Sequence, residues 1–328
     1  MDEVAGSSPA PPTTVSGAGF RNFARAMEGD KEGATPSTTV AELAEAWLLS
    51  QQARGCSPHT VAKRRLICAH FARAIGVLSE CTPPRISAYI VRLQQSRRKP
   101  GTVWTYTSSL HTFFAWCVEA GLLDRNPMGG LKMKQPKALP SVPDDDAVDK
   151  LLKACPDTWE GRRNRALVAL LADSGLRISE ALRVRIEEIN FVDRTIRVHG
   201  KGQKEAVAHF GADVAHHMRQ WLTKRRDAHL EDYLFIGRTG RPLGRRYGLT
   251  ILHRLSKRAG LVRRISPHHL RHYAATSILK RTGDLELVRQ VLRHETLTMA
   301  LRYAHLTRPD VSAKFRRASP LDNLRAGR

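Results

Sequence analysis

Six side chains in the C-terminal half of the sequence are of the types needed to transfer a phosphodiester bond without a metal ion. Two guanidinium groups can neutralise the nonbridging oxygens of a phosphate and the charge added in the transition state. A histidine can take the proton of a tyrosine, because a phenol with a pKa of about 10 is a poor nucleophile near neutral pH. A lysine or a histidine can protonate the departing oxygen. The candidates are Arg177, Lys201, His268, Arg271, His294 and Tyr303.

Glycines lie close to Arg177 and Lys201 in the sequence. Gly175 is predicted to end one helix and Arg177 to open the next, where a guanidinium adds to the positive end of a helix dipole and favours phosphate. Lys201 lies between Gly200 and Gly202 in a predicted hairpin turn, from which its ammonium can reach a phosphate or a leaving oxygen. The glycines lack the Walker spacing of a nucleotide-binding loop. Each residue alone is weak evidence, because surface arginines and lysines are common.

The histidines and the tyrosine are spaced for predicted helices. His268 and Arg271 are three residues apart and share a helix face. His268 and His272 have the four-residue spacing of a zinc pair, but the Glu-x-x of a zincin is absent and Arg271 places a cation beside any metal, so zinc is disfavoured. His294 precedes Tyr303 by nine residues across a predicted helix–turn–helix. No Asp/Glu cluster accompanies these segments, which disfavours a two-metal nuclease.

The charge of the chain points to a polyanionic partner. The 54 Lys and Arg residues outnumber the 31 Asp and Glu residues, which gives a formal charge of +23. Residues 37–140 carry a net charge of +9 and residues 141–328 one of +16, whereas residues 1–36 carry −2. A field of this size favours nucleic acid over a merely solubilising surface, and its distribution is typical of a two-part clamp.

Composition indicates a protein of the reducing cytoplasm, associated with the nucleoid through DNA. No run of about 18 apolar residues is present, so no membrane span is predicted. The acidic start at Asp2 and Glu3 is unlike a signal peptide. The cysteines are odd in number and contain no Cys-x-x-Cys pair, which disfavours a disulfide framework or a cysteine zinc site. They are Cys56, Cys68, Cys81, Cys117 and Cys155.

Composition shifts divide the chain into five segments. Residues 1–36 are rich in Ser, Pro and Gly and are predicted to be a disordered tail. Residues 37–130 have the apolar periodicity of four helices, and residues 131–143 form an extended basic linker with three prolines. A second folded domain is predicted over residues 144–310. Residues 311–328 form a C-terminal tail that can dock on a neighbouring protomer or stay disordered.

Local signals place the elements within the two domains. Ser57-Pro58 begins the second helix and Gly76 is predicted to end it, while Asp144–Asp146 begin the first helix of the second domain. A β-hairpin is predicted over residues 195–210. The predicted fold is therefore mostly α with a small β-sheet. Further helices are expected at 212–228, 244–259, 267–281, 284–293 and 297–305.

The order and spacing of the motifs resemble the tyrosine recombinase (phage integrase) family, of the simple two-domain, Xer-like type. The resemblance covers about residues 38–310. It implies a helical core-binding domain and a mixed α/β catalytic domain that together encircle DNA. The motifs are Gly-Leu-Arg at 175–177 followed by Ser-Glu, Gly-Lys-Gly-x-Lys at 200–204, His-x-Leu-Arg-His at 268–272, and Leu-x-His at 292–294.

The resemblance also implies a role for each candidate. Arg177 and Arg271 would clamp the phosphate, Lys201 would protonate the 5′-oxygen, and Tyr303 would form a 3′-phosphotyrosyl intermediate. His268 would be the general acid/base, and His294 would make a second contact with the phosphate. Glu180 would support the arginines without contacting the phosphate itself. The chain departs from the family at Arg293, where glycine is common, at Ala206, where arginine is common, and near His209, where proline is common.

Partners and cofactors follow from the same resemblance. The expected partner is double-stranded DNA with specific recombination sites, bound by four protomers on two sites. Neither ATP nor a metal ion is expected, because the phosphotyrosine conserves the bond energy. The apolar residues of the C-terminal tail, Phe315 and Leu321, are candidates for contact with a neighbouring protomer. Candidate DNA contacts are Lys63, Arg64, Arg65, Lys132, Lys134 and Lys137.

The sequence thus predicts a site-specific DNA recombinase. Two alternatives remain open at this point. A type IB topoisomerase shares the chemistry but relaxes supercoils without joining two sites, and a noncatalytic DNA-binding relative would share only the fold. The sequence does not disclose the DNA target, because base recognition depends on which side chains meet the groove edges. It is equally silent on accessory proteins and on whether integration, excision or resolution is performed.

Overall fold

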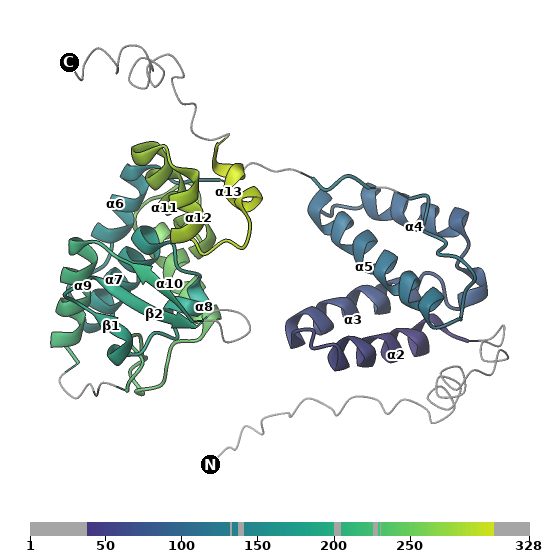
Figure 1. Ribbon diagram of the computed structural model, residues 1–328, viewed down its shortest axis with the longest axis horizontal. Helices are drawn as coiled ribbons and strands as arrows, with labels where there is room; N and C mark the ends of the chain where they lie inside the picture. The colour runs from purple at the N-terminus through teal and green to yellow at the C-terminus, as the bar shows by residue number, and fades with distance from the viewer. Residues whose placement is uncertain are drawn as a thin grey trace, which may run out of the picture. The chain divides into compact units, whose positions relative to one another are not determined.

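The computed structural model describes residues 38–131, 133–136, 141–199, 205–225, 229 and 231–304. The chain divides into two compact units on either side of residue 138 (Figure 1). Several predictions lie outside the described residues: the N-terminal tail, the turn with Lys201, the linker residues Lys132 and Lys137, and the C-terminal tail with Phe315 and Leu321. No described helix has the length and apolarity needed to cross a membrane.

The described residues of the first unit form four helices with a short 3₁₀ turn, Leu78–Glu80, between the second and third (Figure 1). Thr39 and Glu42 form a capping box at the start of the first helix, and the Ser57 hydroxyl accepts from the Thr60 backbone N–H at the start of the second. These caps satisfy backbone N–H groups that the first turn leaves unpaired. The helices are α2 (Val40–Ala53), α3 (Pro58–Ala72), α4 (Pro83–Gln95) and α5 (Pro100–Glu119).

Aromatic side chains fill the centre of the first unit. Trp47, Phe71, Phe113 and Phe114 are all fully buried. Phe71 meets Phe114 edge to face with ring centroids 5.8 Å apart, and Trp47 meets Phe113 in the same way at 5.6 Å. Such pairs stabilise a core beyond the burial of their area. These aromatics therefore serve the core of a small helical domain.

The second unit combines helices with a three-stranded antiparallel sheet in the order β1–β2–β3 (Figure 1). Ile196 pairs with Ala208 in the hairpin register, and both are buried. The strands are β1 (Ile189–Asn190), β2 (Thr195–His199) and β3 (Glu205–His209). The helices are α6 (Asp145–Lys153), α7 (Trp159–Ser174), α8 (Ile178–Ala181), α9 (Ala212–Thr223), α10 (Arg245–Arg258), α11 (Pro267–Thr282), α12 (Leu285–Val291) and α13 (Leu297–Ala304), with a 3₁₀ turn at Ile186–Glu188.

Helix α7 forms the centre of the second unit. Its residues 166–172 are all buried, and it packs against α6, α9 and α11. A helix that is apolar on every side must be surrounded by other elements. Helices α12 and α13 close over α11 with a smaller cluster that contains Leu279, Leu292 and Tyr303. This arrangement brings the ends of α7, α11, α12 and α13 together.

The predicted fold class is confirmed, with three local corrections. Helix α9 ends at Thr223, before the predicted residue 228. Helix α3 ends at Ala72 rather than at Gly76, whose backbone does not adopt the left-handed conformation of a terminating glycine. The two-residue strand β1 has no sequence signal, since so short a strand shows no alternation.

Candidate active site

The junction between α7 and α8 requires glycine at position 175. Gly175 has a φ of 60°, the left-handed conformation that ends a helix. A Cβ atom built there would lie 2.5 Å from Leu292 Cδ2. The glycine thus lets the residues that follow α12 approach the end of α7. Arg177, two residues on, occupies the N-cap position of α8 as predicted, but α8 has only four residues, so its dipole adds little to the site.

Arg177 and Arg293 share the carboxylate of Glu180. Arg177 Nη1 lies 2.7 Å from Glu180 Oε1, and Arg293 Nη2 lies 2.8 Å from Glu180 Oε2. Burial by itself raises the pKa of Glu180, but the Arg177 backbone N–H and the Arg293 charge outweigh it, so the pKa lies below its usual value. Glu180 is nearly buried, whereas the Arg177 side chain is 44% exposed. The carboxylate therefore holds an arginine that still faces outward.

Arg293 departs from the glycine that is common in the family, and the backbone shows why glycine suits the position. Its φ is 54°, which costs a side-chain-bearing residue about 1–2 kcal/mol. The ion pair with Glu180 and a hydrogen bond from Arg293 Nη1 to the Val291 carbonyl compensate this strain. Among Arg177, Arg271 and Arg293, Arg293 is the most buried after Arg271, and burial lowers the pKa of Arg293.

Arg271 joins three segments. Its Nη1 donates to the Gly175 carbonyl and its Nη2 to the Leu292 carbonyl, both at 2.6 Å. The side chain is buried, and burial together with the Arg177 charge lowers its pKa to about 10. A guanidinium has five N–H donors, so donors remain for a phosphate. Arg271 therefore links the ends of α7 and α12 to α11 and keeps its charge near Arg177.

Tyr303 is buried, and its hydroxyl contacts a histidine other than the two expected from the sequence. The tyrosine is 1% exposed. Its hydroxyl lies 2.9 Å from Nδ1 of His272 on α11. Burial raises the pKa of Tyr303, and the charges of Arg271 and Arg302 oppose that rise. Burial also lowers the pKa of His272 to about 4, with a further contribution from His268, so the imidazole is neutral near pH 7.

The two expected histidines flank this pair. The His294 ring lies parallel to the Tyr303 ring with centroids 6.4 Å apart, and no described residue pairs with its buried Nδ1 atom. Burial lowers the pKa of His294 to about 4, and Arg271 contributes. His268 is exposed and stacks on His272 at 6.0 Å. Loss of solvent contact and the charge of Arg271 lower the pKa of His268.

A hollow of about 690 Å³ opens beside Arg177. Arg293 and Glu180 line it together with His199 and Glu205, the described residues on either side of the segment 200–204 that includes Lys201. Lys201 itself lies outside the described residues, so its role stays a prediction. The described parts of the chain contain no group of three or more His, Cys, Asp or Glu side chains placed to hold a metal ion.

The candidate DNA contacts of the first unit differ in how freely their charges project. Lys63 and Lys134 are exposed. Arg64 stacks over the Trp47 ring at 5.1 Å and donates to the Gln51 side chain. Arg65 forms a two-point ion pair with Glu45. Of these, Lys63 and Lys134 are the better placed for long-range attraction of a polyanion.

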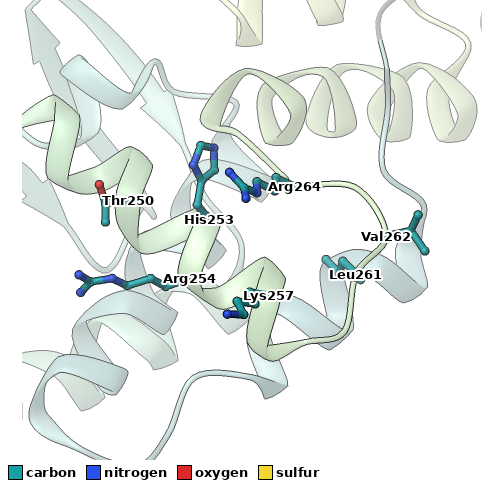
Figure 2. Close-up of a pocket in the computed structure, with 7 residues that line it drawn as sticks. All are labelled: Thr250, His253, Arg254, Lys257, Leu261, Val262 and Arg264. Carbon is teal, nitrogen blue, oxygen red and sulfur yellow. The ribbon is translucent and has the colours of Figure 1, made fainter.

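A second basic surface lies on α10, and the sequence analysis did not predict it. Thr250, His253, Arg254 and Lys257 recur at helical spacing on one face and line a hollow of about 350 Å³ with Arg264 (Figure 2). Figure 2 shows the side chains of Arg254, Lys257 and Arg264 around this hollow, with no carboxylate among the lining residues. In the sequence, the i, i+3, i+4, i+7 spacing of these polar and basic residues indicates that they share one face of the helix.

Comparison with known proteins identifies the family. The model of the phage integrase family matches residues 142–309. Tyrosine recombinase XerC of Corynebacterium efficiens is 32% identical over 272 residues, which cover 81% of this chain and 87% of the relative. Tyrosine recombinase XerD of Oceanobacillus iheyensis is 28% identical over 241 residues, which cover 72% of this chain and 81% of the relative.

A solved structure of similar fold is the XerH site-specific recombinase bound to a palindromic difH substrate. It superimposes with a TM-score of 0.68 and 19% identity, over 92% of this chain and 95% of that one. Three findings indicate the same family: sequence identity over most of both chains, the family match to the second unit, and the shared fold. The chain therefore belongs to the phage integrase family, the tyrosine recombinases.

Proposed function

We propose that the protein cuts and rejoins double-stranded DNA at specific sites through a covalent bond between Tyr303 and a 3′-phosphate. One observation carries this proposal: Tyr303 of α13 meets His272 of α11 beside Arg271, at the point where α7, α11 and α12 converge. Residues far apart in the sequence thus supply a nucleophile, neutral imidazoles and fixed cations at one place.

The chemistry follows from the charges and protons of these side chains. The Tyr303 oxygen attacks phosphorus as the bond to the 5′-oxygen breaks, a histidine takes the phenolic proton, and Lys201 or His268 gives a proton to the leaving oxygen. Arg177 and Arg271 stabilise the negative charge that gathers on the nonbridging oxygens. The reverse attack by a 5′-hydroxyl restores the DNA and frees the tyrosine, so no ATP is consumed.

The charge of the chain and a DNA-bound structure of similar fold support DNA as the partner. Both units are basic, and the XerH relative of similar fold is a recombinase bound to its DNA substrate. Residues 37–130 would form the core-binding half of a clamp and residues 144–310 the catalytic half. Four protomers on two DNA sites would form the working assembly, located with the nucleoid in the cytoplasm.

Two assays on one DNA preparation test the proposal against its nearest rival. A plasmid carrying two copies of the recognition site should yield recombinant products, each passing through a protein–DNA adduct. A type IB topoisomerase would relax the supercoiled plasmid without joining the sites, and a noncatalytic binder would give neither adducts nor products. The recognition site is obtained first, by sequencing DNA that stays joined to the trapped protein.

The basic face of α10 gives a separate prediction about binding. The double variant Arg254→Ala/Lys257→Ala should weaken DNA binding at all sequences and lower the salt dependence, because each lost phosphate contact removes about 0.9 from the log–log slope. Fluorescence anisotropy between about 50 and 200 mM salt measures both quantities. Lys150→Ala/Lys153→Ala on α6 removes two charges already paired with Asp146 and Asp149, and serves as the control. Equal slopes for the two double variants would remove α10 from the interface.

A further inference from the structure

We infer that His272 is the proton acceptor for the Tyr303 nucleophile. This inference rests on the proposed function and adds to it a role for His272, the last residue of the His-x-Leu-Arg-His motif, to which the resemblance assigned none. A general base must lie within about 2.6–3.2 Å of the atom whose proton it removes. His272 Nδ1 lies 2.9 Å from the Tyr303 hydroxyl oxygen, which is within this range.

The protonation state of His272 fits the role. In the inferred role the phenol donates its proton in this hydrogen bond, which requires the tautomer with a lone pair on Nδ1 and the ring proton on Nε2. Burial keeps the pKa of the ring low, which ensures that the acceptor is neutral near pH 7. A phosphate dianion-like transition state beside the ring would raise that pKa at the moment when the proton moves.

The other two histidines are placed for different tasks. His268 is exposed and contacts His272 by ring stacking, so it faces solvent, from which a leaving group could receive a proton. The His294 ring lies parallel to the Tyr303 ring, and no described residue pairs with its buried Nδ1, so this atom does not accept from the Tyr303 hydroxyl. Of the three histidines, His272 is thus the one placed to serve the nucleophile.

The step balances without any further reactant. The phenolic O–H bond breaks and its proton passes to His272 Nδ1 as the oxygen–phosphorus bond forms. The bond from phosphorus to the 5′-oxygen breaks with its electron pair on oxygen, which takes a proton from Lys201 or His268. In the return step His272 gives the proton back to the tyrosine as the phosphotyrosyl bond breaks.

His272→Asn and His272→Phe test the inference by single-turnover formation of the protein–DNA adduct. Asparagine can keep an acceptor near the position of Nδ1 but cannot take up a proton, whereas phenylalanine loses both functions. Both variants should slow adduct formation by about 10²- to 10⁴-fold, the usual contribution of a general base. His216→Asn on α9, an exposed histidine whose ring contacts only its neighbour His217 among the described aromatic rings, should react at the wild-type rate.

A substrate with sulfur in place of the bridging 5′-oxygen separates proton removal from leaving-group protonation. A thiolate leaves without a proton donor, so this substrate should rescue His268→Asn or Lys201→Ala but not His272→Asn. With the sulfur substrate, the rate of adduct formation by His272→Asn should rise about tenfold per pH unit between pH 6 and 9, because attack then needs phenolate formed by hydroxide. The wild-type rate should stay flat, since His272 is neutral throughout that range. The charged or titratable groups that face this pair are His268, His269, Arg271, His294 and Arg302.

The outcomes distinguish this inference from the proposed function. If His272→Asn forms adducts at the wild-type rate, or if the sulfur substrate rescues it, His272 is not the acceptor, and the role of Tyr303 as nucleophile is decided separately by its own test. If adducts persist without the Tyr303 hydroxyl, the proposed function fails first. Matching melting temperatures of the asparagine variant and the wild type confirm that a slow rate reports chemistry rather than misfolding.

Discussion

Tyr303→Phe should abolish the covalent joining of protein to DNA while leaving DNA binding intact. The change removes one oxygen atom and keeps a ring that is buried among Leu279, Val288 and Leu292. The phenolic oxygen is the atom that becomes bonded to phosphorus, and no other described group at this site is placed to replace it. A nicked substrate whose cleaved strand diffuses away traps the adduct, which is then counted on a denaturing gel.

Tyr273→Phe is the matched control. It makes the same change on α11, at a half-buried tyrosine whose hydroxyl interacts with Asp145 and Ser277 rather than with His272. This variant should form adducts at the wild-type rate. Adducts that persist in Tyr303→Phe and vanish in Tyr273→Phe would move the nucleophile to α11, and adducts that persist in both would place it elsewhere in the chain.

The parts of the fold that local chemistry determines were open to prediction from the sequence. Ser57 and Asp144 cap helices because their side chains accept backbone N–H groups within three residues, and Gly175 ends α7 because its left-handed φ suits glycine. Such signals depend on neighbours in the chain. The end of α9 was missed because no glycine or proline follows Thr223 closely enough to mark it in the sequence.

The geometry of the site depends on contacts between distant residues, which spacing alone does not specify. Tyr303 and His272 are 31 residues apart, and only the packing of α13 on α11 decides which histidine the hydroxyl meets. In the sequence His272 stands out only as a possible zinc partner of His268 and as the last residue of the His-x-Leu-Arg-His motif, without a role in the chemistry. Similarly, the pairing of Arg293 with Glu180 spans 113 residues and follows from the closure of α12 over the end of α7. Lys201 stays a prediction.

The two arginines of the site should differ sharply when each is replaced by alanine. Arg177→Ala removes a side chain that is 44% exposed, and Glu180 keeps its pair with Arg293. Its folding free energy should change by less than about 1 kcal/mol, as for other surface charges. Adduct formation should nevertheless fall by about 10²- to 10³-fold, the loss typical of a single transition-state donor.

Arg271→Ala should lower both activity and stability. It leaves the buried Gly175 and Leu292 carbonyls without their donor, and each unsatisfied group costs about 1–3 kcal/mol. Urea unfolding should therefore show a loss of about 2–5 kcal/mol, which Arg162→Ala, the loss of a surface ion pair with Asp157, should not produce. An Arg271→Ala protein as stable as Arg177→Ala would show that the two carbonyls find other donors. Full activity in either variant would show that its guanidinium does not meet the phosphate, because the chemistry proposed here gives both arginines the same charge to neutralise.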